Sequence, residues 1–168
     1  MSLSRPLHRS CTFVSAFLAA AMTATVGTAL GFQHIGGYLP CKLCLEQRIP
    51  YYIGIPVMVL AVLSSVLKLP TAATRLLILI GGGLMLWGFV LAGYHSGVEW
   101  AWWPGPDDCS NPIVSSTSGS LLDQLNAVIP PSCSEAVWRF LGLSFAGWNF
   151  IVSGILATIA FVTVVRKN

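Results

Sequence analysis

The chain has 168 residues, of which 55% are hydrophobic and only 9% are charged. Soluble domains usually carry about a quarter of charged residues, so this composition excludes an ordinary water-soluble protein and indicates a membrane protein. The formal charge of +3 comes from basic residues scattered along the chain without a clustered stripe, which argues against a nucleic-acid partner.

Four apolar stretches are long enough to cross a bilayer, which takes about 20 residues each. They are residues 13–32, 49–67, 76–94 and 144–165. In lipid a span must satisfy its own backbone hydrogen bonds, so each stretch is predicted to be a helix. The sequence therefore predicts an all-α membrane protein, a four-transmembrane-helix bundle that forms a single domain over residues 1–168, with outer loops at 33–48 and 95–143.

The first stretch also has features of a cleaved signal peptide, since Arg5 and Arg9 precede an apolar run that contains small residues. The run is longer than a usual signal core, and Ala29, a candidate cleavage residue, lies well inside it. We therefore expect an uncleaved first span.

Charges near the span ends predict the orientation, because Lys and Arg are retained on the cytoplasmic side. The two termini and the connection between the second and third spans carry basic and no acidic residues, namely Arg5, Arg9, Lys68, Arg75, Arg166 and Lys167. All acidic residues fall in the other two loops. We expect both termini to be cytoplasmic and both remaining loops to face the outer side.

The long outer loop has features beyond a simple connection. Three tryptophans near its start are typical of an interfacial aromatic belt. Apolar residues within 121–129 have helical spacing and predict one short amphipathic helix. Residues 137–143 are expected to lie on the membrane surface without crossing it.

Four of the five cysteines lie in the outer loops. Cys41 and Cys44 form a Cys-Lys-Leu-Cys motif in the first, Cys109 and Cys133 lie in the second, and Cys11 stands alone at the cytoplasmic end of the first span. Two structural disulfides are the ordinary interpretation, with three formal pairings. A Cys41–Cys44 ring is so small that it restrains little chain entropy, which favours exchange chemistry. A zinc site ranks lower, because zinc ribbons usually use two CxxC pairs, and we predict no metal.

The surroundings of the CxxC motif favour a reactive thiolate. Pro40 precedes it, so the second helix is expected to begin near Cys41 with backbone N–H groups directed toward the sulfurs. Arg48 follows Cys44 by four residues, one helical turn along the same face. An arginine at this depth is costly unless it has a function or extends outward to the interface.

Two histidines, His34 and His95, close the first and third spans on the outer side, near the level of Cys44 and Arg48. An interfacial histidine is the commoner case for either. A histidine and an arginine facing a thiolate would also polarise a carbonyl-bearing, lipid-soluble acceptor and stabilise its developing oxyanion. A quinone has this chemistry.

The chain resembles the disulfide bond formation protein B (DsbB) family over nearly its whole length. The resemblance lies in the order of these segments: Phe32-Gln33-His34, Pro40-Cys41-Lys42-Leu43-Cys44, Gln47-Arg48-Ile49-Pro50-Tyr51, Gly93-Tyr94-His95, Trp103-Pro104-Gly105-Pro106, Cys109, Cys133 and Phe140-Leu141-Gly142-Leu143. A lone CxxC motif would be weak, but this order, together with the topology and the arginine, is specific.

The resemblance implies an electron relay in a bacterial inner membrane, with a short and a long periplasmic loop. A reduced DsbA-like thioredoxin-fold protein would attack the Cys109–Cys133 disulfide, with Cys109 forming the mixed disulfide. Cys41 and Cys44 would then reoxidise that pair. Cys41 would exchange across the loops, and Cys44, as the quinone-facing thiolate, would pass electrons to a bound quinone, ubiquinone or menaquinone.

By the same resemblance, Cys44, Arg48 and His95 would form the quinone site. Two alternatives stay open at this point. One is a four-span structural or scaffolding protein whose loop disulfides are inert, and the other is a paralogue that serves one dedicated partner.

Overall fold

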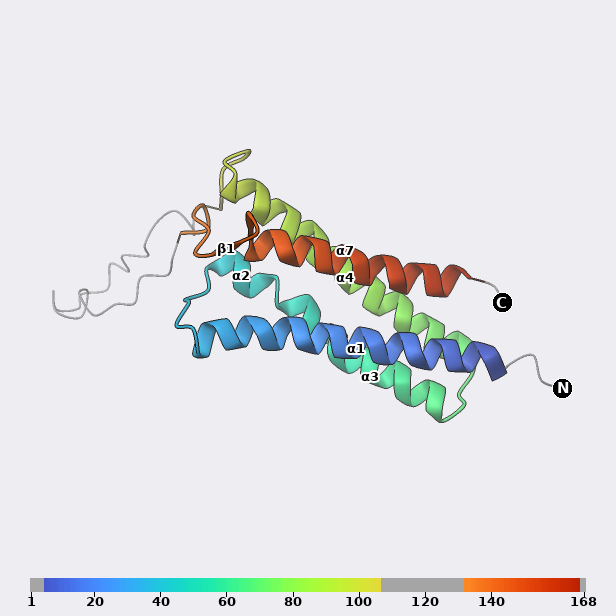
Figure 1. Cartoon of the computed structure of the whole chain (residues 1–168). Coiled ribbons are helices and arrows are strands. Elements are labelled where there is room, and N and C mark those ends of the chain that lie inside the picture. Colours follow the sequence, from blue (N-terminus) through green and yellow to red (C-terminus); the bar gives the residue numbers. More distant parts are fainter. Residues whose placement is uncertain (1–4, 107–131, 167–168) are drawn as a thin grey trace, which may run out of the picture.

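A computed structural model describes residues 5–106 and 132–166 of the chain, apart from the side chains of residues 5–9. Four long helices form an elongated bundle (Figure 1), and each is long and apolar enough to cross a membrane. They are α1 (Arg5–His34), α3 (Ile49–Val66), α4 (Thr71–Glu99) and α7 (Phe145–Val165). The predicted four-helix membrane fold is confirmed. Cys109 and the amphipathic helix predicted at 121–129 lie outside the described residues.

Two of the helices extend beyond the predicted spans. α1 begins at Arg5 instead of residue 13, and α4 covers Thr71–Glu99 instead of 76–94. Hydropathy marks only the part of a helix that crosses hydrocarbon, so the polar turns at either end escape it. The outer loop therefore begins after Glu99 and not at residue 95, which places His95 on a regular helix.

The second helix is interrupted just after the CxxC motif. Cys41 has an extended backbone and caps the short helix α2 (Lys42–Glu46), because its sulfur accepts the backbone N–H of Cys44 at 3.4 Å. In a continuous helix the ring of Pro50 would clash with the carbonyl of Glu46, and Pro50 has no N–H to donate. The chain therefore breaks after Glu46 and α3 begins as a separate helix, where the sequence analysis expected one helix from the motif onward.

The bundle is held by apolar packing in its middle. α4 packs along α3 and α7, α1 packs mainly on α3, and the contact between α1 and α7 is small. Gly82 allows α4 to approach α7, since a Cβ there would lie 3.0 Å from the Cβ of Ala160. Close helix packing also involves Gly81, where a Cβ would meet the side chain of Met58, whereas a Cβ on Gly83 would meet nothing within 4 Å.

The two ends of the bundle differ in content. One end carries α2 and an antiparallel pair of two-residue strands, β1 (Arg139–Phe140) and β2 (Leu143–Ser144), and the other carries both termini and the α3–α4 turn (Figure 1). The segment 137–143 thus forms part of a hairpin and does not cross the bundle. We call these ends the motif end and the terminal end.

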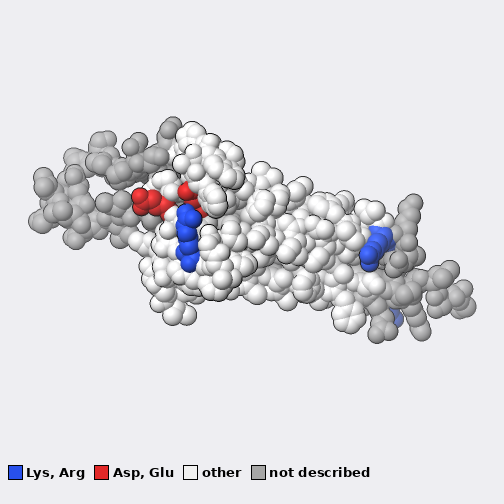
Figure 2. Space-filling view, turned by 45° about the horizontal axis from the view of Figure 1, so that its top comes forward, with Lys and Arg blue, Asp and Glu red and all other residues white. Residues whose placement is uncertain are grey.

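Charge separates along the same axis. Figure 2 shows acidic and basic side chains together near the motif end, basic ones at the terminal end, and an uncharged belt between them. Among the described residues the carboxylates of Glu46, Glu99 and Glu135 all belong to the motif end. This distribution is the one that a membrane-spanning bundle requires, because charged side chains avoid the hydrocarbon core.

Candidate redox site

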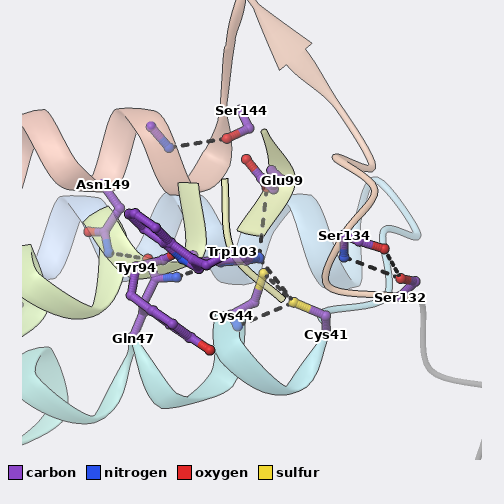
Figure 3. Close-up of polar contacts among 12 residues, drawn as sticks. Cys41, Cys44, Gln47, Tyr94, Glu99, Trp103, Ser132, Ser134, Ser144 and Asn149 are labelled. Carbon is purple, nitrogen blue, oxygen red and sulfur yellow. Dashed lines mark hydrogen bonds and ion pairs between the residues drawn. The ribbon is translucent and has the colours of Figure 1, made fainter. Parts of the chain in front are cut away.

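The two cysteines of the motif lie side by side at the start of α2. Both are free thiols, and their sulfur atoms lie 3.0 Å apart and share a hydrogen bond (Figure 3). Cys41 is buried, with 3% of its surface exposed, and Cys44 is partly buried. A disulfide bond is about 2.0 Å long, so the two sulfur atoms need to move only a short distance toward each other to form one.

Cys41 lies against a histidine from another helix. The Nε2 atom of His95 in α4 is 3.7 Å from the Cys41 sulfur, and the Oε1 atom of Glu99, one turn later, is 3.8 Å from the same nitrogen. The hydrogen bond from Cys44 lowers the pKa of Cys41 well below its usual value of 9.0; burial opposes this effect, and His95 adds to it. The direction of this shift makes Cys41 the thiolate of the pair, whereas the family resemblance implied a thiolate at Cys44.

A chain of hydrogen-bonded side chains continues from His95 into the bundle (Figure 3 labels Gln47 and Asn149). Gln47 Nε2 lies 2.7 Å from His95 Nδ1, Asn149 Nδ2 donates to Gln47 Oε1 at 2.6 Å, and the Tyr51 hydroxyl donates to Asn149 Oδ1 at 2.6 Å. The chain links α3, α7 and α4 and ends at the Cys41 sulfur. The sequence analysis did not assign a role to Gln47, Tyr51 or Asn149, although an asparagine inside an otherwise apolar span was a visible signal.

A cavity of about 290 Å³ lies between α1, the α2–α3 segment and α7. Its wall is mostly apolar and includes Phe32, Leu39, Phe145 and Val152. Polar side chains in its wall include Gln33, Cys44, Gln47, Arg48, Tyr51 and Asn149. The guanidinium of Arg48 donates a hydrogen bond to Gln33 Oε1 from α1, which fixes its orientation at the cavity.

The residues singled out in the sequence fall on two sides of the motif. Cys44 and Arg48 line the cavity, whereas His95 is not among the lining residues and contacts Cys41 instead. Cys133 is disulfide-bonded and packs with Cys41 in a small apolar cluster that includes Leu43 and Val98. Cys41 thus faces the second cysteine loop, and Cys44 faces the cavity.

Comparison with known proteins identifies the family. The model of the disulfide bond formation protein DsbB family matches residues 11–163. The chain belongs to this family. It is similar to the disulfide bond formation protein B of Polaromonas sp., with 28% identity over 160 residues that cover 91% of this chain and 90% of the relative. The corresponding protein of Methylococcus capsulatus is 31% identical over 160 residues, covering 89% of each chain, and that of Vibrio alginolyticus is 30% identical over 141 residues, covering 81% and 82%. No solved structure matches.

Membership of the DsbB family implies a multi-pass membrane thiol oxidoreductase of the inner membrane that supports disulfide bond formation. The described geometry has the parts that such chemistry needs, since it contains a thiolate, a neighbouring thiol and a second cysteine in a disulfide. The predicted resemblance to this family is confirmed.

Thiol and imidazole groups also bind metals, and the ligand atoms of Cys41, Cys44 and His95 lie within 4.8 Å of one another. A closed structural zinc site takes four ligands. Cys133 cannot complete the set in this form, because its sulfur is in a disulfide. We therefore interpret the cluster of this DsbB-family chain as a redox site and assign no metal to it.

Proposed function

We propose that this chain passes electrons from a reduced DsbA-like periplasmic dithiol, through Cys109/Cys133 and then Cys41/Cys44, to a quinone, either ubiquinone or menaquinone. The observation that carries the proposal is the division of the CxxC pair between two faces. Cys41 packs with Cys133, and Cys44 lines a mostly apolar cavity together with Arg48. A relay between a protein dithiol and a lipid-soluble acceptor requires these two faces.

The first step takes place at the second cysteine loop. Cys133 is disulfide-bonded while Cys11, Cys41 and Cys44 are free, so the proposal pairs Cys133 with Cys109. A thiolate of the partner attacks Cys109, and the bond to Cys133 breaks. The partner's second thiol then releases Cys109, which leaves the partner oxidised and both loop cysteines reduced.

The second step transfers the same two electrons to the motif in its disulfide form. A thiolate of the reduced loop pair attacks Cys41, and Cys44 leaves as the thiolate. Exchange within the loop pair then restores its disulfide and releases Cys41. The thiolate-stabilising hydrogen bonds at Cys41 make it a good leaving group for this release.

The third step returns the motif to its disulfide and uses the cavity. A quinone bound there would supply a two-electron, two-proton acceptor with two carbonyl oxygens. Arg48, which lines the cavity, would donate guanidinium N–H groups to such an oxygen, and the apolar wall would exclude water from the ring. Oxidation of the pair releases two electrons and one proton, which comes from Cys44, because Cys41 has already lost its proton; the second proton comes from water.

The proposal also fixes the orientation of the bundle. The motif end would face the periplasm and both termini would face the cytoplasm, which agrees with the basic side chains of Lys68, Arg75 and Arg166 at the terminal end. Labelling of single cysteines introduced at Lys68 and at Glu46, in intact cells with a membrane-impermeant reagent, tests this. Reagent access at residue 68 and protection at residue 46 would reject the proposed direction of electron flow.

The direct test is quinone reduction by purified full-length protein in detergent, with a reduced DsbA-like protein as donor. Ubiquinone and menaquinone are each added, and quinone loss and partner oxidation are followed together. We expect one quinone reduced per partner disulfide formed, no reduction by a Cys44→Ser variant, and full activity of a Cys11→Ser variant as control. Quinone reduction that persists without Cys44 would exclude this route and favour a structural role for the loop disulfides.

A further inference from the structure

The hydrogen-bonded chain from Tyr51 to His95 has a defined direction. A tyrosine hydroxyl can donate or accept, and here Tyr51 donates its single hydrogen to Asn149 Oδ1. This orients the Asn149 amide so that its Nδ2 donates to Gln47 Oε1. The Gln47 amide is thereby oriented in turn, and its Nε2 is the atom that faces His95 Nδ1.

The direction of the chain determines which imidazole nitrogen carries the proton. The Nε2 group of an amide can only donate, so His95 Nδ1 must accept and carries no hydrogen. In a neutral imidazole the hydrogen is then on Nε2, which lies 3.7 Å from the Cys41 sulfur. His95 therefore presents an N–H, and not a lone pair, to the sulfur.

We infer that Asn149 and Tyr51 are positioning residues for the cysteine pair: acting through Gln47, they hold His95 as the tautomer whose Nε2–H faces the Cys41 sulfur. The inference deepens the proposed function, because it concerns the reduced motif of the same relay. It can nevertheless be tested without quinone or partner.

The role of Asn149 follows from the symmetry of the Gln47 amide. An amide can turn over within almost the same volume, which exchanges its donor and acceptor ends. Without the N–H of Asn149 bonded to Gln47 Oε1, the Gln47 amide could turn over and place Oε1 against His95. Its oxygen would then accept a hydrogen from His95 Nδ1. The Nε2 atom of His95 would carry no hydrogen and would direct a lone pair at the Cys41 sulfur. That lone pair would disfavour the thiolate, whereas the present N–H stabilises it.

Other groups also act on the Cys41 sulfur, and the test must separate them from this chain. The Cys44 sulfur on α2 shares a hydrogen bond with it, Glu99 lies one turn beyond His95 on α4, and the disulfide-bonded Cys133 packs in the same cluster. None of the three contacts Asn149 or Tyr51 through a hydrogen bond that the described structure contains. Substitutions at Asn149 and Tyr51 therefore change the histidine and leave these groups in place.

The first experiment measures iodoacetamide alkylation of Cys41 against pH in the fully reduced, full-length protein. Trypsin cleaves after Lys42, so Cys41 and Cys44 fall in different peptides and mass spectrometry separates them. We expect Asn149→Leu to move the midpoint upward by roughly 0.5 to 1 pH unit, the effect of losing one neutral hydrogen bond. Tyr51→Phe should move it less, in the same direction.

The matched control is Thr158→Val on the same helix, where an exposed hydroxyl bonds only its own helix at Gly154. Its pH profile should coincide with that of the wild type. Coincidence of the Asn149→Leu profile with the wild type, or an equal shift in the control, would overturn the inference. If Asn149→Leu does not insert or fold, the Tyr51→Phe profile decides in the same way.

The second experiment observes the tautomer itself. The chain has three histidines, so ¹⁵N-histidine labelling with His95→Gln as an assignment variant identifies the His95 signals. We expect the Nε2–H tautomer in the reduced wild type and a mixed or reversed population in Asn149→Leu. An Nδ1–H tautomer in the wild type would overturn the inference. Since neither experiment contains quinone, failure of quinone reduction by the wild type would count against the proposed function alone.

Discussion

Two buried cysteines at opposite ends of the bundle have nearly the same exposure and very different surroundings. Cys11 is 2% exposed and packs in the apolar core with residues such as Leu18 and Met22. Cys41 is 3% exposed and has a thiol, a backbone N–H and an imidazole directed at its sulfur. Burial alone therefore says nothing about the reactivity of a thiol in this protein; the donors around the sulfur decide it.

The polar side chains of the two ends also differ in what they bind. At the terminal end hydroxyls pair with each other between helices, Thr12 with Ser65 at 2.6 Å and Ser64 with Thr74 at 2.9 Å. At the motif end the interhelical chain terminates on a sulfur. We infer that polar contacts of the first kind hold helices together, whereas those of the second kind also set the chemistry of a thiol.

The largest expected difference between the ends is in the exchange reaction. Cys41→Ser should abolish electron transfer from the partner to quinone, because the motif can then no longer form the Cys41–Cys44 disulfide that exchanges with the second loop. Cys11→Ser should leave the rate within about twofold of the wild type. Stopped-flow oxidation of the reduced partner, with thiol trapping of the loop cysteines, checks both variants. A strong loss of activity in folded Cys11→Ser would contradict the contrast drawn between the two thiols.

A smaller effect is expected from the charge at the cavity. Arg48→Gln should lower kcat/KM for quinone by about tenfold to a hundredfold, since a hydrogen bond to a charged group contributes about 1.5–3 kcal/mol. Alkylation of Cys41 should be nearly unchanged, because Arg48 lines the cavity and donates its hydrogen bond to Gln33. Arg166→Gln at the terminal end is the matched control. Equal losses in both variants would show that Arg48 has no special role toward quinone.

Much of this contrast between the ends could be predicted from the sequence. Hydropathy located the four helices, because each crosses the whole apolar layer. Spacing placed Cys44 and Arg48 on one side, and both do line the same cavity, although the helix breaks between them. Their contact with quinone stays a prediction. The break itself was foreseeable from Pro50 but was not predicted.

The remaining features depend on tertiary contacts that have no local signature. Asn149 meets Gln47 across 102 positions of the chain, and no periodicity relates the two. The β1–β2 turn places Leu141 at a φ of 51°, a conformation that favours glycine or asparagine, so turn preferences do not predict it. The helical extension of α4 to Glu99 likewise lies beyond the apolar stretch that hydropathy detects.

A pH titration sharpens the comparison of the two thiols. Because the pKa of Cys41 is lowered from its usual value of 9.0 in the folded, reduced protein, its alkylation should stay near the maximum well below that pH. It should fall only as the pH drops through the lowered pKa. Cys44→Ala should move the fall upward, since the Cys44 hydrogen bond is its largest cause. Cys11 should react only after denaturation, because its sulfur is buried in the apolar core. Rapid labelling of Cys11 in the native protein would remove the contrast.

The smallest expected effect concerns the structural polar contacts of the terminal end. Thr74→Val keeps the side-chain shape but removes the buried hydrogen bond between α3 and α4, whose Thr74 side chain is fully buried. Interhelical hydrogen bonds in membrane proteins contribute on average about 0.6 kcal/mol and at most about 1.7 kcal/mol. The free energy of unfolding in detergent should therefore decrease by an amount of this size. Thr158→Val, which removes an exposed hydroxyl bonded to its own helix, should change it less. Quinone reduction should be unchanged in both variants, because neither hydroxyl belongs to the row of hydrogen-bonded side chains that ends at Cys41. A selective loss of activity in Thr74→Val would mean that the two ends are coupled through the bundle.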